Sequence, residues 1–383
     1  MAKNFQLVHK ICTTRCQSTN VFTAVSLTNR EYYTVKITDL DDLTDPQVIL
    51  NEISRTRHIR HNNILPLLNS FVQESQIWCI YPHIYYGSCR DILNAIQAYY
   101  TANSDQNLNT NNNNNIDRAD EQIRLCFNEQ SIQPIVRSIL LALDYLHSKH
   151  IIHRCVCPEN IYINQSGHVY LGGMGYAISL IDNGFLNKRL HEYPSKIDNY
   201  VNYLSPEILQ QNLIGYNTKS DIYSLGVTIC ELANGIHPFI GCEKTQMLFE
   251  KLVGYDIGLW DRSILTTESK NIFVSVCASE NPKVIAQIQR RCFSEKFRNF
   301  VDLCVVKNHE FRANCHQLLH HTYMKKMKLQ SCLSTFQISI ISEGLVELQK
   351  KIKNKTIQNQ SDFSQIVQKP TTPSKNINSW NFD

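Results

Sequence analysis

Three residues in this sequence have side chains that could bind phosphate groups or a metal ion. Lys36 ends a short apolar, β-branched segment, and Glu52 follows on a helix-like segment. An ammonium held beside a carboxylate can bind phosphate groups, although either residue alone is more typical of a solvated face. Asn160, at the end of the loop 153–160, offers an amide oxygen that could ligate a metal ion. These three residues are candidates for nucleotide binding.

The order of further motifs resembles that of a protein kinase domain. In kinases a strand lysine and a helix glutamate, here Lys36 and Glu52, form an ion pair that holds the phosphates of ATP. The other matching segments are the catalytic loop His153-Arg154-Cys155-Val156-Cys157-Pro158-Glu159-Asn160, the end of the activation segment at Ser205-Pro206-Glu207, the start of the central helix at Asp221-Ile222-Tyr223-Ser224-Leu225-Gly226, and Arg312, which would pair with Glu207. The resemblance covers roughly residues 5–327 and implies the kinase fold, whereas function has to be argued from the site.

The hydrophobic pattern of the first part predicts a small sheet. Residues 21–27, 32–37, 64–68 and 77–81 are apolar or β-branched and predict strands. Residues 46–58 have apolar side chains on one side and predict a helix. The amino-terminal part is therefore expected to be a sheet-rich lobe with one helix.

The pattern becomes helical in the second part. Apolar residues from 132 to 146 fall on one face of a helix, and residues 161–163 and 169–171 flank a turn sequence that predicts a hairpin. Residues 221–234 are nearly all apolar, with Gly235 as a candidate C-cap. Strands followed by helices predict an α+β, bilobal protein-kinase-like fold with a small sheet-rich N-lobe and a mainly helical C-lobe.

Composition shifts divide the chain into three expected parts. They are an N-lobe at 1–84, a C-lobe at 85–330, and a helix with a flexible tail at 331–383. Residues 101–120 are rich in Asn and predict a disordered insertion in the C-lobe. The tail ends in Trp380-Asn381-Phe382-Asp383, whose two aromatic rings would face one side of an extended peptide and could anchor it in a partner.

Three positions lack the side chains that phosphoryl transfer requires. Cys155 stands where kinases have the catalytic Asp, Cys157 where they have a loop Lys, and Gly173 where they have the metal-binding Asp. A thiol is a poor substitute for a carboxylate base, and a glycine offers Mg²⁺ no side-chain oxygen. Residues 11–16, which should wrap the phosphates, contain no glycine. Because a general base alone contributes about 10²- to 10⁴-fold, we expect a pseudokinase with no catalytic residue and no metal.

The remaining site residues are interpreted as structural or as nucleotide-binding. The structural residues are His153, Arg154, Met174, Glu207, Asp221 and Arg312. Cys155 lacks an evident activating pair beyond His153, so we interpret its thiol as structural rather than nucleophilic. Tyr81, before the hinge, would narrow the adenine pocket. With Lys36, Glu52 and Asn160 present, ATP is a possible cofactor that would not require Mg²⁺. The alternative is that Lys36 and Glu52 form a buried ion pair that only holds the lobes together.

Several stretches closely resemble the STRAD family of STE20-related kinase adaptors. They are residues 169–173, 203–213, 215–224, 230–235 and 245–252. The resemblance implies an inactive adaptor that binds and allosterically activates a Ser/Thr protein kinase resembling liver kinase B, together with an armadillo-like helical scaffold, and presents its activation-loop face like a substrate. It also implies that the partner is kept in the cytoplasm, with the nucleus as a second location. The family's Trp-Glu-Phe tail docks into the scaffold; Trp380 and Phe382 match it, and Asn381 replaces the acidic residue.

Two other functions stay open, and composition excludes two classes of partner. The chain could be a weakly active, metal-independent STE20-like Ser/Thr kinase that uses Lys36 and Asn160, or an ATP sensor whose lobes close on the nucleotide. A net charge of +4 lacks the bias of a nucleic-acid binder, and no apolar run is long enough to span a membrane. Fourteen irregularly spaced cysteines are typical of reduced thiols.

Overall fold

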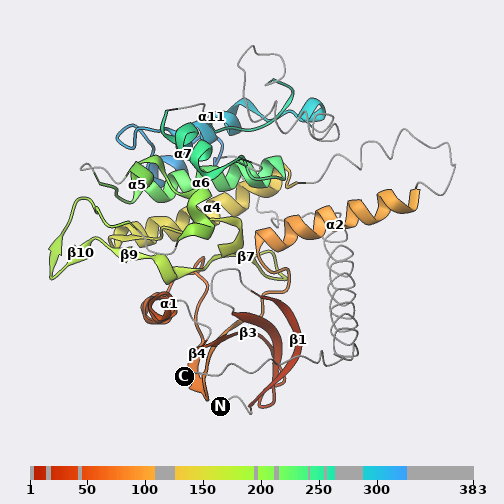
Figure 1. The fold of residues 1–383 in the computed structure, drawn as a ribbon. Helices are drawn as coiled ribbons and strands as arrows, with labels where there is room; N and C mark the ends of the chain where they lie inside the picture. Colours follow the sequence, from red (N-terminus) through yellow and green to blue (C-terminus); the bar gives the residue numbers. More distant parts are fainter. Residues whose placement is uncertain are drawn as a thin grey trace, which may run out of the picture.

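The chain folds into two lobes, one built on a sheet and the other on helices (Figure 1). The computed structural model describes residues 4–13, 19–41, 45–107, 126–193, 197–210, 215–239, 242–253, 257–263 and 288–325. This arrangement confirms the α+β, bilobal fold class. The predicted lobe limits at residues 84 and 330 stay predictions, and the tail with Trp380 and Phe382 lies outside the described residues.

The N-lobe is an antiparallel sheet in the order β1-β2-β3-β5-β4, with helix α1 beside it. Its elements are β1 (Phe5–Thr13), β2 (Asn20–Ser26), β3 (Tyr32–Asp39), α1 (Pro46–His58), β4 (Asn69–Gln73) and β5 (Gln76–Pro82). α1 has the predicted bounds because Asp45 caps its first turn by accepting a hydrogen bond from the N–H of Gln47, and Pro46 suits the first helical position. The strands predicted at 21–27, 32–37 and 77–81 are confirmed within two residues.

The strand predicted at 64–68 is wrong. Ile64 forms only an isolated bridge to Leu171 of the C-lobe, and β4 begins at Asn69. The run is apolar because Ile64, Leu65 and Leu67 are buried, and burial without alternation does not identify a strand. Strand β1 was not predicted.

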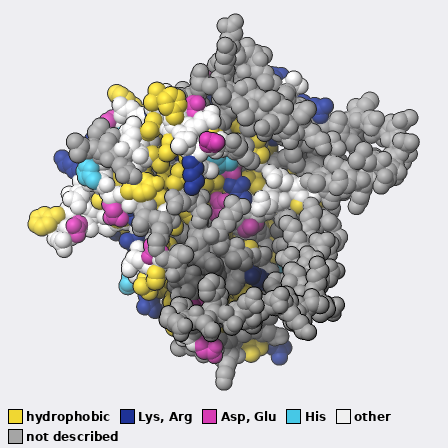
Figure 2. Space-filling model, viewed as in Figure 1, with side chains coloured by type: hydrophobic (Ala, Val, Ile, Leu, Met, Phe, Trp, Pro, Cys, Tyr) yellow, Lys and Arg dark blue, Asp and Glu magenta, His cyan; other side chains and the backbone are white. Residues whose placement is uncertain are grey.

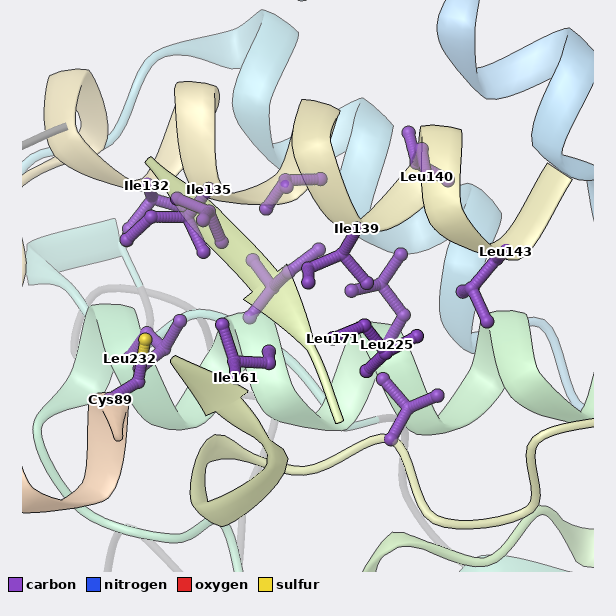
Figure 3. Packing of buried hydrophobic residues seen from close by; sticks show 14 of the residues in the cluster. Cys89, Ile132, Ile135, Ile139, Leu140, Leu143, Ile161, Leu171, Leu225 and Leu232 are labelled. Carbon is purple, nitrogen blue, oxygen red and sulfur yellow. The ribbon is translucent and has the colours of Figure 1, made fainter. Parts of the chain in front are cut away.

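The C-lobe core lies between two long helices (Figure 3). These are α4 (Glu129–Ser148) and α6 (Lys219–Asn234), with the hairpin β7 (Ile161–Ile163) and β8 (Val169–Leu171) beside them. Ile139 and Leu143 of α4 point towards Leu225 of α6. Gly235 ends α6 in the left-handed conformation, with φ of 79°. The predicted helix, hairpin and C-cap are confirmed.

Part of the predicted insertion is helical. Helix α2 (Cys89–Asn107) projects from the C-lobe (Figure 1), so residues 101–107 are not the disordered segment that was expected. The helix begins where Ser88 and Asp91 exchange hydrogen bonds between side chain and backbone. The high Asn content of residues 101–120 predicted disorder, and that reasoning did not consider the helix start at Ser88 and Asp91. Residues 108–125 lie outside the described part.

Several short elements lie between β8 and α6 in the chain. Its elements are η3 (Met174–Tyr176), β9 (Ile178–Ser179) paired with β6 (Ile151–Ile152), the hairpin β10 (Ile181–Asp182) and β11 (Phe185–Leu186), η4 (Asp198–Tyr203) and α5 (Pro206–Gln210). Figure 1 shows the β10–β11 hairpin extending away from the lobe, and Figure 2 shows hydrophobic side chains at its tip. The hairpin was not predicted.

Three further helices complete the described C-lobe. They are α7 (Lys244–Leu252), α11 (Glu295–Val305) and α12 (Cys315–Leu319), beside the short 3₁₀ helix η2 (Pro158–Asn160) of the catalytic loop. The buried ammonium of Lys251 donates hydrogen bonds to the carbonyls of Val201, Asn202 and Leu204 at 3.2, 2.6 and 2.7 Å. α7 therefore holds the end of η4. Within the described ranges, none of the helices combines the length and the hydropathy that a membrane crossing needs.

A buried histidine follows α6 and should make stability depend on pH. Nδ1 of His237 accepts a hydrogen bond from the N–H of Phe239 at 3.1 Å. Burial, and then the ammonium of Lys251, lowers the pKa of His237 to about 3. Below about pH 6.5 the imidazole therefore binds a proton in the unfolded chain but not in the folded chain. The contribution of His237 to the free energy of unfolding is complete above that pH and is lost as the pH falls towards 3.

We predict that His237→Asn, which keeps an acceptor near Nδ1, flattens this dependence. Between pH 7.5 and 5.5 the parent should lose about 1.4 kcal/mol more of its free energy of unfolding than the variant. Urea denaturation at the two pH values measures the difference. Equal losses in both proteins would contradict a buried, neutral His237.

Candidate functional site: a kinase-like cleft

The predicted lysine–glutamate pair is formed between β3 and α1. Lys36 Nζ lies 3.1 Å from Glu52 Oε1, and both side chains are less than one-fifth exposed. Tyr81 of β5 donates its hydroxyl to the same Oε1 at 3.1 Å, and Lys36 Nζ lies 5.1 Å from the centre of the Tyr81 ring. Burial alone would lower the pKa of Lys36, but the Glu52 carboxylate outweighs it and raises that pKa. α1 is therefore tied to the sheet by a charged pair and a phenol.

One buried carboxylate on α6 fixes the start of the catalytic loop by hydrogen bonds. Asp221 accepts hydrogen bonds from the N–H groups of His153 and Arg154, each at 2.8 Å, and from Nε2 of His147 at 2.9 Å. Burial alone would raise the pKa of Asp221, but the bond from His147 and its charge outweigh burial and lower it. His153 donates Nε2–H to the carbonyl of Gly172 at 2.9 Å and accepts the N–H of Cys155 at Nδ1, at 3.2 Å, so the ring is neutral. Burial lowers the pKa of His153.

The Asn160 side chain directs its amide towards Cys155. Its Nδ2 donates to the carbonyl and to Sγ of Cys155, at 2.9 and 3.2 Å. Gly173 lies against the same amide with φ of 76°, and a Cβ built on Gly173 would overlap the Asn160 side chain. Asn160, Cys155 and Gly173 thus lie together, and the Asn160 side chain fills the space beside Gly173.

The ion pair predicted for the end of the activation segment is also formed. Arg312 donates to both carboxylate oxygens of Glu207, at 2.6 and 3.0 Å, and its guanidinium lies 5.0 Å from the centre of the Tyr223 ring. Arg312 and Glu207 are buried. Met174 packs in the C-lobe core, and Cys157 is fully buried, which raises the pKa of its thiol.

Comparison with known proteins identifies the family. The chain matches the protein kinase domain family over residues 15–324. It is 32% identical to STE20-related kinase adapter protein alpha of Mus musculus over 339 residues, which cover 84% of this chain and 70% of the relative. It is 30% identical to STE20-related kinase adapter protein beta of Homo sapiens (78% and 69% covered) and 32% identical to STE20-related kinase adapter protein strd-1 of Caenorhabditis elegans (76% and 66% covered). The chain belongs to the STE20-related kinase adapter family.

The cleft of this adapter encloses a cavity of about 350 Å³ between the lobes. Lys36, Glu52, Tyr81 and Asn160 line it, and so does Tyr162, which the sequence reasoning missed. Tyr162 alternates in β7 with buried isoleucines on either side, so its ring points away from the core towards the cavity. That alternation was the available signal.

Arg90 is a second residue that the sequence reasoning missed. It stands at the start of α2 and donates to Glu159 of the adapter's catalytic loop and to Tyr203, each at 3.0 Å, and also to Glu231 of α6. Burial raises the pKa of Glu231 despite the arginine. A lone arginine in a helix gave no sequence signal, because its three partners come from distant segments.

The crowding at Gly173 can be tested with alanine substitutions. We predict that Gly173→Ala costs about 1–3 kcal/mol, because Asn160 must give up its buried hydrogen bonds to Cys155. In the Asn160→Ala background the same substitution should cost less, since the clashing amide is gone. Urea denaturation of the four chains of this double-mutant cycle measures the coupling.

A matched control isolates the backbone contribution. Gly184, in the hairpin turn, has φ of 83° and nothing within 4 Å of an added Cβ. Gly184→Ala therefore reports the cost of the left-handed conformation alone. If Gly173→Ala costs no more than Gly184→Ala, or the same in both backgrounds, Asn160 does not fill the site.

Proposed function

We propose that this chain is a catalytically inactive adaptor that binds and allosterically activates a Ser/Thr protein kinase resembling liver kinase B. The observation that carries the proposal is the turned amide of Asn160, bonded to Cys155 where a kinase needs its base. Phosphoryl transfer depends on positioning and on charge stabilisation by carboxylate-bound metal. Cys155 and Gly173 offer neither a base nor a metal ligand there.

The other carboxylates of the cavity support the same conclusion. Glu52 accepts hydrogen bonds from Lys36 and Tyr81. Asp91 accepts two from Ser88, and burial raises its pKa. Glu159 is paired with Arg90. Each of these three cavity-lining carboxylates thus has at least one partner among the described residues, while Oε2 of Glu159 is buried without one.

The activation segment supports binding of a partner. Ile181, Phe185 and Leu186 of the β10–β11 hairpin are exposed, and Phe185 is 76% exposed. Figure 2 shows this apolar tip standing clear of the lobe. Exposed aromatic and aliphatic residues on a projecting element are suited to insert into an apolar site on a partner. We propose that the hairpin contacts the activated kinase.

The tail would supply the second contact. Trp380 and Phe382 are proposed to anchor the chain to an armadillo-like helical scaffold, and the three-protein complex would hold the kinase in the cytoplasm. ATP is proposed as a cofactor: Lys36, fixed by Glu52, would hold its phosphates, and Gly173 adds no metal ligand, so Mg²⁺ would not be required.

We predict that the chain raises the peptide-phosphorylating activity of the partner kinase in the presence of the scaffold. Phe185→Ala should lower the partner's affinity for the chain at least about tenfold, the effect expected of an aromatic anchor. Phe249→Ala, on α7 and 60% exposed, is the matched control and should change little. Activation that is equally strong with both variants would remove the hairpin from the interface; no activation by the parent would end the proposal.

We predict that ATP raises the melting temperature of this chain by the same amount in Mg²⁺ and in EDTA. Lys36→Met should abolish that rise, because the ammonium that would hold the phosphates is gone. Thermal shift at saturating ATP measures it. A rise that requires Mg²⁺ would show a metal site that the residues at 155 and 173 do not provide.

The alternative, a weakly active STE20-like kinase or an ATP sensor, rests on the intact Lys36–Glu52 pair. Slow phosphate transfer by the parent that Lys36→Met abolishes would favour the kinase. Transfer that is equal in both chains would exclude it. Nucleotide-dependent partner binding, with no transfer, would favour the sensor.

A further inference from the structure

Tyr216 connects the catalytic loop to the activation segment. Leu190 and Tyr216 exchange backbone hydrogen bonds at 2.8 and 2.9 Å, as a two-residue bridge. The Tyr216 hydroxyl donates to the carbonyl of Glu192 at 2.7 Å and accepts a bond from Arg154 Nη1 at 3.2 Å. Tyr216 is buried, so its hydroxyl is costly to leave unpaired. We call Arg154, Tyr216 and Glu192 the activation-segment bridge.

The bridge also carries an ion pair. Arg154 Nη1 lies 3.8 Å from Glu192 Oε1. On α1, Nη1 of Arg55 is buried without a hydrogen-bond partner in the part of the chain that the structure describes. Burial and then Arg154 lower the pKa of Arg55, while Glu192 opposes them. Glu192 is therefore the ion-pair partner of Arg154, and its negative charge also acts on Arg55 of α1.

In regulated kinases, arginines bind a phosphate on the activation loop. Phosphorylation of an activation loop orders it by new contacts between the phosphate and arginines. We propose that Glu192 and Tyr216 take the place of that phosphate here, so that the activation segment is held in its presented form without phosphorylation. The role of the bridge in presenting the segment to a partner rests on the proposed adaptor function. The hydrogen bonds of the bridge belong to the isolated chain and do not depend on that function. Glu192 is largely exposed, and its ion pair alone contributes little, so the Tyr216 hydroxyl is the stronger element.

Hydrogen exchange of the isolated chain tests the bridge. Tyr216→Phe removes one hydroxyl and keeps the ring. The backbone amides of Leu190 and Tyr216 should exchange roughly fivefold faster, the factor that corresponds to one ordinary hydrogen bond. Tyr323→Phe is the matched control, because the hydroxyl of this buried tyrosine also donates to a carbonyl, that of Glu129 at 3.1 Å, but within the C-lobe core. It should leave both amides unchanged.

Charge and phosphorylation are tested in the same assay. Glu192→Gln should speed exchange at Leu190, whereas Glu31→Gln, an exposed glutamate of the β2–β3 turn, should not. Unphosphorylated chain made in bacteria, with its mass verified, should exchange as slowly as phosphorylated chain. Faster exchange of the unphosphorylated chain, or no effect of Tyr216→Phe and Glu192→Gln, would overturn the inference.

Partner binding separates this inference from the proposed function. If the bridge presents the segment, Tyr216→Phe should weaken binding of the partner kinase by about the same fivefold factor, and Tyr323→Phe should not. Faster exchange at Leu190 together with unchanged partner binding would contradict the presentation role while leaving the adaptor function intact. Absence of partner binding by the parent chain would instead contradict the proposed function.

Discussion

The buried carboxylate of Asp221 is the constraint on which the cleft depends. It accepts three hydrogen bonds, two of them from consecutive backbone N–H groups of the catalytic loop. One of those belongs to Arg154, which has φ of 62°, an uncommon conformation for a side-chain-bearing residue that persists only where its surroundings fix it. Asp221 of α6 thus fixes the start of the catalytic loop. From there the Arg154 side chain contacts Tyr216, and further along the loop the Asn160 side chain contacts Cys155.

The cleft keeps the interactions that hold a kinase fold together. The Lys36–Glu52 pair, the Asp221 carboxylate and the Glu207–Arg312 pair are all formed. These interactions connect strand to helix and loop to core, so they stabilise any protein with this fold, active or not. The substituted positions, Cys155 and Gly173, are those whose side chains would act on a substrate or a metal.

Sequence predicted the framework better than the details of the site. Motifs with a fixed order in the chain allowed the placement of Lys36, Glu52, Asp221 and Arg312. The periodicity of apolar residues predicted the long amphipathic helices. The direction of the Asn160 amide could not be predicted, since it depends on the space that Gly173 leaves. The β10–β11 hairpin was missed because two-residue strands carry almost no periodic signal.

A built-in charge suits an adaptor better than a reversible one. A surface that is already ordered loses less conformational entropy when the partner docks, so more of the contact energy appears as affinity. A phosphate would make that surface conditional on another enzyme. Glu192 and the Tyr216 hydroxyl make it a property of the fold, and Lys251 fixes the other end of the segment through three carbonyls. Regulation would then act on assembly with partners rather than on the shape of this chain.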